Sequence, residues 1–149
     1  MTGRAMSVRT AEPPDAPAIA GISAQEYDSW SSGDFLSTMN NPCARIWVCE
    51  EPGEAILGYV VLYFDEYGAE LMQIAVDQDR RREHISTRLM DAVDSFLQKK
   101  HIPQIMLEVR AANTAAREFY EHRGFVENHI KKDFYRNPPD DAVKMLQRI

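Results

Sequence analysis

The sequence predicts an α/β fold: one domain built on a mixed, mostly antiparallel sheet that is flanked by helices. Three observations support this fold class. The chain has 149 residues, of which 44% are hydrophobic, so it can bury one full core but is too short for two ordinary domains. Runs of β-branched and aromatic residues alternate with segments in which apolar residues recur at helical spacing. Clusters of glycine, proline and asparagine separate the two kinds of segment.

The first half of the chain is predicted to contain four strands and two short helices. The strands are rich in β-branched and aromatic residues and lie at 7–10, 45–50, 55–65 and about 70–76. Pro52-Gly53 predicts a hairpin between the second and third strands, and the fourth continues an antiparallel meander. Asp15 is expected to cap a helix that runs to about Ala24, and a second helical segment ends before Asn41-Pro42.

The second half alternates between helices and strands. Apolar residues recur at helical spacing at Ile85, Leu89, Val93 and Phe96/Leu97, and the helix that they predict ends before Pro103. Asn113 is expected to cap a second helix, and Gly124 is expected to end it. The remaining strands are predicted at 104–110, 125–135 and 142–148, with a turn around Asn137-Pro138-Pro139.

Composition narrows the classes of function. A net charge of −6 and a sequence pI of about 5.2 disfavour a nucleic-acid binder that relies on phosphate contacts. The longest apolar run, Ala55 to Phe64, is about half as long as a membrane-spanning helix, and Met1 to Ser7 lacks the apolar core of a signal peptide. The two cysteines and four histidines show no zinc-ligand spacing. We therefore expect a metal-free, cytoplasmic protein without a nucleic-acid or membrane partner, with one domain at 7–149 after a loose tail at 1–6.

One strand-to-helix turn has the properties of an anion site. The segment from Val76 to Thr87 leads from the fourth strand into an amphipathic helix, whose first N–H groups have no partner within the helix. Arg80, Arg81 and Arg82 add three positive charges in an otherwise acidic chain, which suits a ligand with several phosphates. On these residues alone, a solvated basic loop before a helix is the alternative.

Three blocks of sequence, in matching order and spacing, resemble the GCN5-related N-acetyltransferase (GNAT) superfamily, and within it the RimI-type ribosomal-protein-alanine N-acetyltransferases. The blocks are Met72-Gln73-Ile74-Ala75-Val76-Asp77, Leu107-Glu108-Val109-Arg110-Ala111-Ala112-Asn113 and Phe119-Tyr120-Glu121-His122-Arg123-Gly124-Phe125. A weaker resemblance to the family's substrate loop extends from Trp30 to Phe35. The resemblance implies a GNAT fold, acetyl-CoA as co-substrate, and direct acetyl transfer to a primary amine, above all the N-terminal α-amine of a protein.

The resemblance also implies a site for acetyl-CoA. The residues that it places there are Ile74, Ala75, Val76, Arg81, Arg82, Glu83, His84, Ile85, Ser86, Thr87 and Asn113. The family's pyrophosphate loop reads Gln/Arg-x-x-Gly-x-Gly/Ala, whereas this chain has Arg81-Arg82-Glu83-His84-Ile85-Ser86. Because glycine lets backbone N–H groups approach a pyrophosphate, we expect His84 to weaken acetyl-CoA binding without abolishing it. Asn113 is expected to hydrogen-bond the pantetheine arm, to cap its helix, or to do both.

Glu108 and Tyr120 are the candidate catalytic pair. Glu108 interrupts the apolar strand at 105–109, where a carboxylate must be solvated, paired or functional. Tyr120 shares an apolar helical stripe with Ala116 and Phe119, so core packing is its alternative role. By resemblance, Glu108 takes a proton from the attacking amine, and Tyr120 protonates the departing coenzyme A thiolate.

The acceptor amine is less well defined by the sequence. Removing a proton at pH 7 costs about 1.4 kcal/mol for an α-amine of pKa near 8 and about 4.6 kcal/mol for a lysine, so a modest base suffices for N-termini. Tyr27, Trp30 and Tyr135 are candidate walls of a peptide groove, although Trp30 can equally anchor its loop to the core. Carboxylates in the flanking loops either attract a basic peptide, such as a ribosomal-protein N-terminus, or are ordinary solvated charges: Asp28, Asp34, Asp140 and Asp141.

Two other functions remain open on the sequence alone. One is acetylation of a small-molecule amine by the same chemistry. The other is a binding module of the same fold in which His84 and Ser86 have removed acetyl-CoA binding. For the oligomeric state, we expect a monomer or a weak homodimer.

Overall fold

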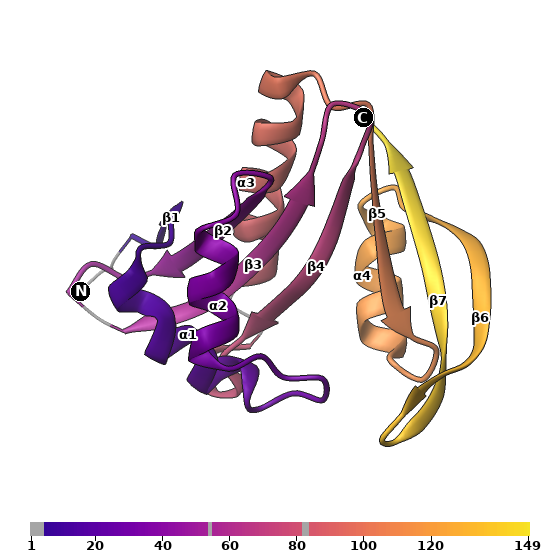
Figure 1. Cartoon of the computed structure of the whole chain (residues 1–149), viewed down its shortest axis with the longest axis horizontal. Coiled ribbons are helices and arrows are strands. Elements are labelled where there is room, and N and C mark those ends of the chain that lie inside the picture. The colour runs from indigo at the N-terminus through magenta and orange to yellow at the C-terminus, as the bar shows by residue number, and fades with distance from the viewer. Residues whose placement is uncertain (1–4, 54, 82–83) are drawn as a thin grey trace.

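Seven strands form one mixed sheet in the order β1-β2-β3-β4-β5-β7-β6 (Figure 1). Their bounds are β1 Ser7–Thr10, β2 Ala44–Glu50, β3 Ile56–Phe64, β4 Ala69–Val76, β5 Gln104–Arg110, β6 Val126–Arg136 and β7 Pro139–Arg148. The structure is a computed structural model that describes residues 5–53, 55–81 and 84–149. All neighbouring strands are antiparallel except β4 and β5, which run parallel. The predicted mixed, mostly antiparallel sheet is confirmed.

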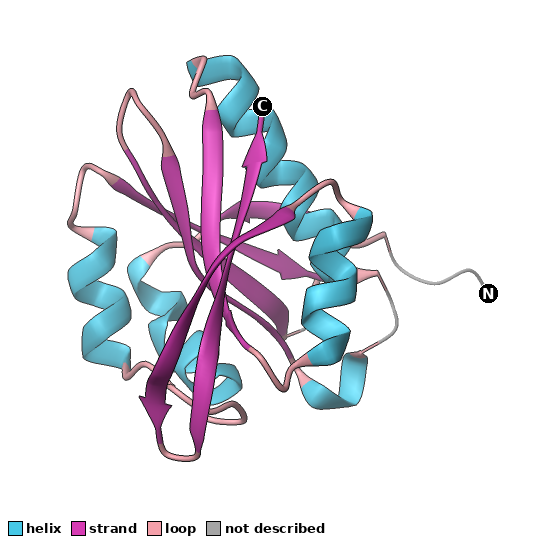
Figure 2. Ribbon diagram, turned by 90° about the vertical axis from the view of Figure 1, so that its right-hand side faces the viewer, coloured by secondary structure: helices cyan, strands magenta, loops and turns pink. Residues whose placement is uncertain are grey.

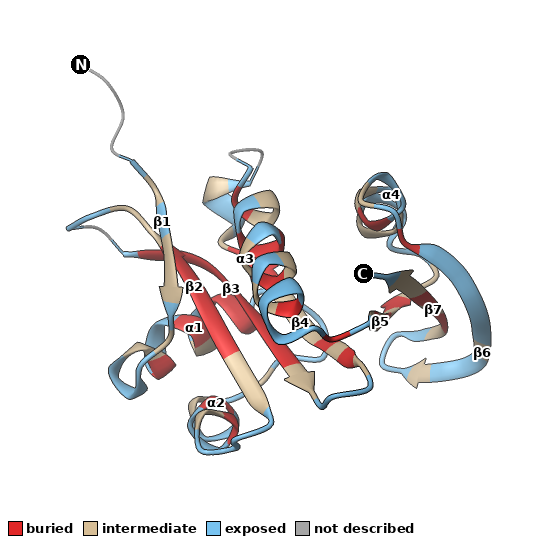
Figure 3. Cartoon of the chain, turned by 90° about the horizontal axis from the view of Figure 1, so that it is seen from above, coloured by how far each residue is buried: buried red, intermediate tan, exposed pale blue. Residues whose placement is uncertain are grey.

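Helices cover both faces of the sheet (Figures 2 and 3). Their bounds are α1 Ala16–Ser23, α2 Ser32–Met39, α3 Ile85–Lys100 and α4 Thr114–His122, and single 3-10 turns lie at 13–15 and 78–80. One face packs against α1 and α2, and the other face packs against α3 and α4. None of the described helices is both long enough and apolar enough to cross a membrane.

Local hydrogen bonds explain where the helices begin and end. Ser31 accepts the N–H of Asp34 (3.1 Å) and the Asp34 carboxylate accepts the N–H of Ser31 (2.8 Å), which caps the start of α2. Asn113 caps α4 as predicted, because its Oδ1 accepts the N–H of Ala116 (3.1 Å). Gly124, with a φ of 100°, follows the end of α4 in the left-handed region that favours glycine.

Two details differ from the sequence prediction. Asp15 lies at the start of α1 but makes no side-chain bond to that helix. Its carboxylate instead accepts hydrogen bonds from Arg9 (2.8 and 3.0 Å) and from the N–H of Glu12 (2.8 Å), and Arg9 lowers the pKa of Asp15.

The last two strands extend further toward each other along the chain than predicted, so the turn between them consists only of residues 137–138. Of the predicted tail, residues 1–4 lie outside the described residues.

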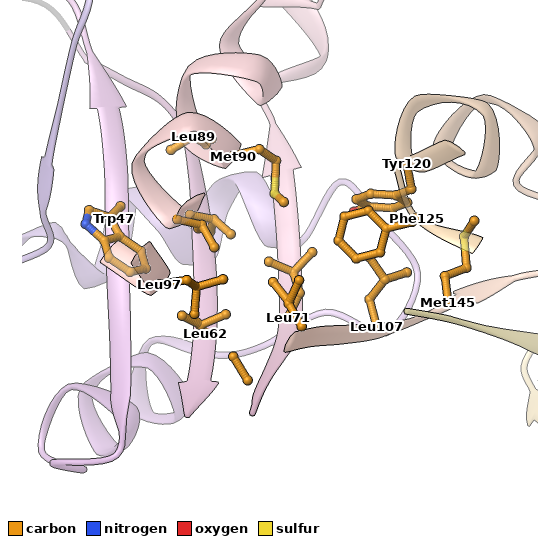
Figure 4. Packing of buried hydrophobic residues seen from close by; sticks show 14 of the residues in the cluster. Trp47, Leu62, Leu71, Leu89, Met90, Leu97, Leu107, Tyr120, Phe125 and Met145 are labelled. Carbon is orange, nitrogen blue, oxygen red and sulfur yellow. The ribbon is translucent and has the colours of Figure 1, made fainter. Parts of the chain in front are cut away.

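The sheet separates two hydrophobic cores. On one face, α3 contributes Ile85, Leu89, Val93 and Leu97, which are at most 2% exposed, as the helical spacing predicted. Tyr120 and Phe125 continue this core over β5 (Figure 4). On the other face, the fully buried side chains of Ile19, Phe35 and Tyr59 pack between α1, α2 and the sheet. β3 is thus buried on both faces, whereas β5 is buried on the face under α4 and partly exposed on the other.

The sheet splits between β4 and β5. These strands pair over three residues only, from Ala69↔Ile105 to Leu71↔Leu107, and then diverge, as Figure 1 shows. The split begins at a β-bulge, because Leu71 pairs with Leu62 and Gln73 pairs with Val61, which leaves Met72 as an extra residue. A bulge bends its strand and increases the twist. Met72 therefore directs the second half of β4 away from β5.

A close contact beside this split yields a prediction about stability. A Cβ at Gly58 would lie 2.9 Å from the Ala75 carbonyl oxygen and 3.1 Å from Cγ2 of Ile85. Gly58→Ala should therefore lower the free energy of unfolding by about 1–3 kcal/mol, because β4 and α3 must shift. Urea denaturation measures the change. In the control Gly21→Ala, nothing lies within 4 Å of the new Cβ, and the helix should be stabilised by about 0.5–1 kcal/mol. Equal effects of the two substitutions would contradict the prediction.

Candidate active site

The split between β4 and β5 opens into two cavities that share a wall. The first, of about 350 Å³, is lined by the loop between α1 and α2, and we call it the loop cavity. The second, of about 360 Å³, is bounded by the start of α3 and one side of α4, and we call it the helix cavity. Ile74 and Ala75 of β4 and Ala116 and Tyr120 of α4 line both cavities. A ligand in the split can therefore contact both cavities at once.

The helix cavity ends at the N-terminus of α3. Ile85, Ser86 and Thr87 line it. Their N–H groups have no partner within the helix, because the first intrahelical bond runs from the N–H of Arg88 to the carbonyl of His84 (3.1 Å). His84, at the position before the helix, makes no side-chain capping bond. The open N–H groups and the helix dipole favour a bound anion at this place.

His84 has a backbone conformation that favours glycine. Its φ of 60° and ψ of 26° lie in the left-handed region, and its exposed side chain lines the helix cavity. This conformation costs an L-residue roughly 1–2 kcal/mol and costs glycine very little. His84, which stands where the family's pyrophosphate loop has glycine, is thus a source of backbone strain. The N–H groups at the N-terminus of α3 nevertheless stay open.

The arginines before α3 form ion pairs. Arg81 pairs with Glu26 at 2.5 Å, and both residues line the helix cavity. Arg80 lines the same cavity and pairs with Glu51. Two predicted acetyl-CoA contacts lie outside the described residues: Arg82 and Glu83. The positive charge predicted at this turn is therefore shared with carboxylates, and an anionic ligand must compete with Glu26 for Arg81.

Glu108 faces the loop cavity from β5. Its neighbours Leu107 and Val109 belong to the core under α4, so the alternation of the strand places Glu108 on the opposite face. The Glu108 side chain is 21% exposed, and its Oε2 forms an ion pair with Lys131 of β6. That oxygen is buried, and none of the described residues gives it a hydrogen bond of good geometry. The carboxylate can therefore accept a further hydrogen bond from a group in the cavity.

Tyr120 lies at the junction of the two cavities. It is 5% exposed and packs edge-on against the rings of Phe119 and Phe125, with 5.4 Å between centroids in each pair. Burial raises the pKa of the Tyr120 hydroxyl, which keeps it protonated at neutral pH. Tyr120 is thus both a core residue and a proton donor that a ligand in the split can reach.

Gln73 ties the loop between α1 and α2 to β4. Its Oε1 accepts hydrogen bonds from the hydroxyls of Ser23 (3.2 Å) and Tyr59, and its Nε2 donates to the carbonyl of Asp28 (3.0 Å). Ser23 also accepts the N–H of Trp30 (2.8 Å). Ser23 and Tyr59 are fully buried. Because bonds shielded from water are strong, they hold the loop in one position over the cavity.

Arg110 ties the same loop to the turn between β6 and β7. Its Nε and Nη2 donate to the two carboxylate oxygens of Asp28, both at 3.1 Å, and its Nη1 donates to the carbonyl of Pro138 at 2.7 Å. The guanidinium lies 4.1 Å from the ring centroid of Tyr135 and 5.2 Å from that of Tyr27. The Arg110 side chain is only 11% exposed. The Asp28 side chain is 51% exposed, so the bidentate geometry, more than burial, distinguishes this pair from an ordinary surface ion pair.

The structure brings the predicted acceptor residues together. Tyr27, Trp30 and Tyr135 all line the loop cavity, and Trp30 also packs against Phe35 of the core at 5.5 Å. Asn113 was expected on the acetyl-CoA side but lines the loop cavity and not the helix cavity. The remaining predicted residues that the structure describes line the helix cavity: Ile74, Ala75, Val76, Arg81, His84, Ile85, Ser86 and Thr87.

The four loop aspartates have partners within the protein, so their expected role in attracting a basic peptide gains no support. Asp28 pairs with Arg110, and Asp34 caps α2. Asp140 accepts the N–H groups of Ala112 (3.1 Å) and of Asp141 (2.8 Å). Asp141 in turn accepts hydrogen bonds from the ammonium of Lys132 (3.2 Å) and from the N–H of Asp133 (2.8 Å). These carboxylates make internal contacts in the loop after α1, in the first turn of α2 and at the start of β7.

Three residues of the site were not singled out from the sequence: Gln73, Arg110 and Lys131. A signal was present for Gln73, which is a polar residue within an apolar strand. No signal in the sequence pointed to Arg110 or Lys131, because charged residues are common at the end of a strand and on an edge strand.

Together, these features fit a long ligand with an anionic part and a reactive part. The N–H groups at the start of α3 can hold phosphates, and the split can hold an extended arm beside Ile74 and Ala75. The arm then leads to Tyr120, which lines both cavities, and on to the loop cavity, which Glu108 lines. Acetyl-CoA has this form: a diphosphate, a pantetheine arm and a terminal thioester.

Known proteins resemble this chain along most of its length. Residues 7–125 match the Acetyltransferase (GNAT) family. The [ribosomal protein bS18]-alanine N-acetyltransferase of Escherichia coli (strain K12) is 29% identical over 146 residues, which cover 96% of this chain and 97% of that protein. The crystal structure of the ribosomal-protein-S18-alanine N-acetyltransferase from E. coli aligns with a TM-score of 0.89 at 27% identity, over 97% of this chain and 94% of that one. Arabidopsis thaliana NAA60 in complex with acetyl-CoA shares the fold, with a TM-score of 0.87 at 16% identity over 97% and 99% of the chains.

The strain at His84 leads to a prediction about ligand binding. His84→Gly should raise the free energy of unfolding by about 1 kcal/mol and tighten acetyl-CoA binding several-fold, because glycine removes the backbone strain and lets the N–H groups adjust to the phosphates. Urea denaturation and calorimetric titration with acetyl-CoA measure the two effects. His84→Ala should give neither, because the Cβ remains in the left-handed region.

A matched control is available at the other end of the same helix. His101 follows α3 with a φ of 57° and is exposed. It does not line the helix cavity. His101→Gly should stabilise the protein as much as His84→Gly but leave acetyl-CoA binding unchanged. If both glycine variants bind acetyl-CoA like the wild type, the account of His84 is wrong.

Proposed function

The chain belongs to the Acetyltransferase (GNAT) family and is an acetyl-CoA-dependent N-acetyltransferase, and we propose that its acceptor is the N-terminal α-amine of a protein. The observation that carries the proposal is that Tyr120 lines both cavities and that Glu108 lines the loop cavity with it. The loop cavity receives the acceptor and the helix cavity receives acetyl-CoA. The transferred acetyl group then lies between a carboxylate and a tyrosine hydroxyl.

Acetyl-CoA would be held mainly by backbone groups. The N–H groups of Ile85, Ser86 and Thr87 bind the diphosphate, and Arg81 contributes once it exchanges Glu26 for a phosphate oxygen. The pantetheine arm runs along Ile74 to Val76, where β4 has lost β5 as its partner. Unpaired N–H groups of this strand are suited to polarise the thioester carbonyl.

The acceptor nitrogen then attacks the thioester carbon directly. Glu108 takes the proton of the amine, and Tyr120 gives a proton to the sulfur as the carbon–sulfur bond breaks. Neither cysteine is placed to act as a nucleophile. Cys49 is buried in the core, and Cys43 lines neither the loop cavity nor the helix cavity. Transfer therefore proceeds in one step without an acetylated enzyme intermediate.

A protein N-terminus is favoured over other amines for two reasons. The E. coli relatives are named as alanine N-acetyltransferases of a ribosomal protein, which is a substrate with a free α-amine. The α-amine is also the easier one to deprotonate, since its pKa lies more than two units below that of lysine. The proposal includes a ribosomal protein as the natural acceptor, and with it a cytoplasmic location.

The catalytic roles can be tested on two peptides of identical sequence. One has a free α-amine and a blocked lysine, and the other has a blocked α-amine and a free lysine. The wild type should acetylate the first in clear preference, and Glu108→Gln and Tyr120→Phe should each lower its kcat by about 10²–10⁴-fold. Mass spectrometry with initial rates measures this.

This assay, together with calorimetry, separates the alternative functions from the proposed one. Full activity of both variants would remove the catalytic assignment. Faster acetylation of a polyamine than of either peptide would place the acceptor among the small amines. Calorimetry that detects no acetyl-CoA binding by the wild type would leave only a non-catalytic binding module.

The role of Arg110 in the loop cavity gives a second prediction. Arg110→Met should raise the KM for the peptide about tenfold and leave the KM for acetyl-CoA unchanged, because only the loop cavity loses a wall. Arg110→Lys should be intermediate, since lysine keeps the charge but not the bidentate geometry. Steady-state kinetics with each substrate varied in turn measure both constants.

Arg123 provides the matched control for this substitution. It pairs with Asp91 (3.0 Å) and Asp94 (2.7 Å), is 17% exposed, and lines neither cavity. Arg123→Met should lower stability without changing either KM. An equal rise in both KM values for Arg110→Met would show that Arg110 acts only on the stability of the fold.

A further inference from the structure

An amine of the protein itself lies beside the proposed general base. The ammonium of Lys131 forms an ion pair with Oε2 of Glu108. The Lys131 side chain is 41% exposed and the Glu108 side chain is 21% exposed, so the contact lies at the edge of the loop cavity. An acceptor amine must approach the same carboxylate to lose its proton. Lys131 therefore lies at the place where Glu108 would meet its substrate.

The sheet holds Lys131 in this position. Lys131 of β6 pairs with Ala142 of β7, which pairs with Arg110 of β5, two residues from Glu108. Residues opposite one another share a face of the sheet, so Lys131 projects to the same side as Glu108. The ring of Phe134 lies 5.1 Å from its Nζ. The long, flexible stem of the lysine lets the amine move from the carboxylate into the cavity.

We propose that Lys131 is a self-acetylation site: the enzyme transfers the acetyl group of its own bound acetyl-CoA to Nζ of Lys131 when no acceptor occupies the loop cavity. The proposal rests on the function assigned to Glu108 above. Lys131 starts as an ammonium: Nζ gives one proton to Glu108, the neutral amine attacks the thioester carbon, and its second proton leaves as the amide forms, so that Glu108 passes both protons to solvent in turn. The carbon–nitrogen bond forms, the carbon–sulfur bond breaks, and the thiolate takes a proton from Tyr120, which is replaced from solvent. The products are an Nζ-acetylated lysine, coenzyme A and, in net balance, one proton released to solvent.

Self-acetylation is expected to be slow but persistent. At pH 7 the neutral fraction of a lysine is roughly 250-fold smaller than that of an α-amine, which favours the protein substrate. Against this, Lys131 is held next to the site and needs no encounter with a second molecule. A bound peptide occupies the cavity and suppresses the reaction. Once acetylated, Lys131 is neutral and cannot re-form its ion pair with Glu108.

The neighbouring lysine supplies an internal control. Lys132 also pairs with a carboxylate, that of Asp141, but its side chain is 78% exposed. Uncatalysed acetylation by acetyl-CoA should therefore favour Lys132 over Lys131. After cleavage at acidic residues, both lysines lie in the fragment 128–133, where fragmentation mass spectrometry assigns each acetyl group.

The experiment incubates the full-length protein with acetyl-CoA alone and compares acetylation at the two lysines over time. The expected result is at least a tenfold excess at Lys131, with a rate per molecule that is independent of protein concentration. A saturating peptide with a free α-amine should remove the excess. Glu108→Gln should remove it too, while Lys132 keeps its low level. Lys131→Arg should leave no excess at any lysine.

The outcomes separate this inference from the proposed function. If the peptide is acetylated but Lys131 does not exceed Lys132, self-acetylation is wrong and the proposed function stands. A rate per molecule that rises with protein concentration would overturn transfer within one molecule. Loss of peptide acetylation in the wild type would remove the proposed function, and an unmodified Lys131 in that same sample would remove the inference with it.

Discussion

The site depends on the early end of pairing between β4 and β5. A parallel pair of strands inside a sheet would normally continue, because unpaired backbone groups in the interior are costly. Here the bulge at Met72 turns β4 away after three residue pairs. The bulge also changes which positions of β4 face the core under α3. Before it these are the odd-numbered Ala69 and Leu71, and after it the even-numbered Val76. The opening is thus built into the strand and needs a ligand to satisfy its exposed edge.

Charge near the site is largely committed to internal pairs. Arg81 pairs with Glu26, Arg110 with Asp28, and Lys131 with Glu108. For a protein of net charge −6 that binds an anionic co-substrate, this arrangement gives backbone dipoles the larger share of recognition. The pairs differ in function. Arg110 is buried and fixes a wall, whereas Arg81 is 51% exposed and can exchange its partner at little cost.

The sequence predicted those features that depend on near neighbours. The stripe of Ile85, Leu89 and Val93 and the cap at Asn113 are set within a few residues, and both were confirmed. Tyr27, Trp30 and Tyr135 line the loop cavity together with Glu108 and Tyr120, whose catalytic roles stay a prediction. Contacts between distant segments were missed, since Gln73 and Arg110 reach Asp28 across 45 and 82 residues. The role expected of Asp15 was wrong for a related reason: Arg9 and a backbone N–H offered it better partners than the helix.

The burial of Tyr120 raises a question about its proposed role as a proton donor. Burial raises the pKa of Tyr120, which by itself would make it a poor acid toward a thiolate, because an ordinary thiol has a lower pKa than an ordinary tyrosine. In the proposed mechanism, however, the sulfur departs at the junction that Tyr120 lines together with the apolar side chains of Ile74 and Ala116. Desolvation raises the pKa of a thiol for the same reason that it raises that of a phenol, since both are anionic when deprotonated. The two pKa values shift in the same direction, so the raised pKa of Tyr120 remains compatible with general acid catalysis.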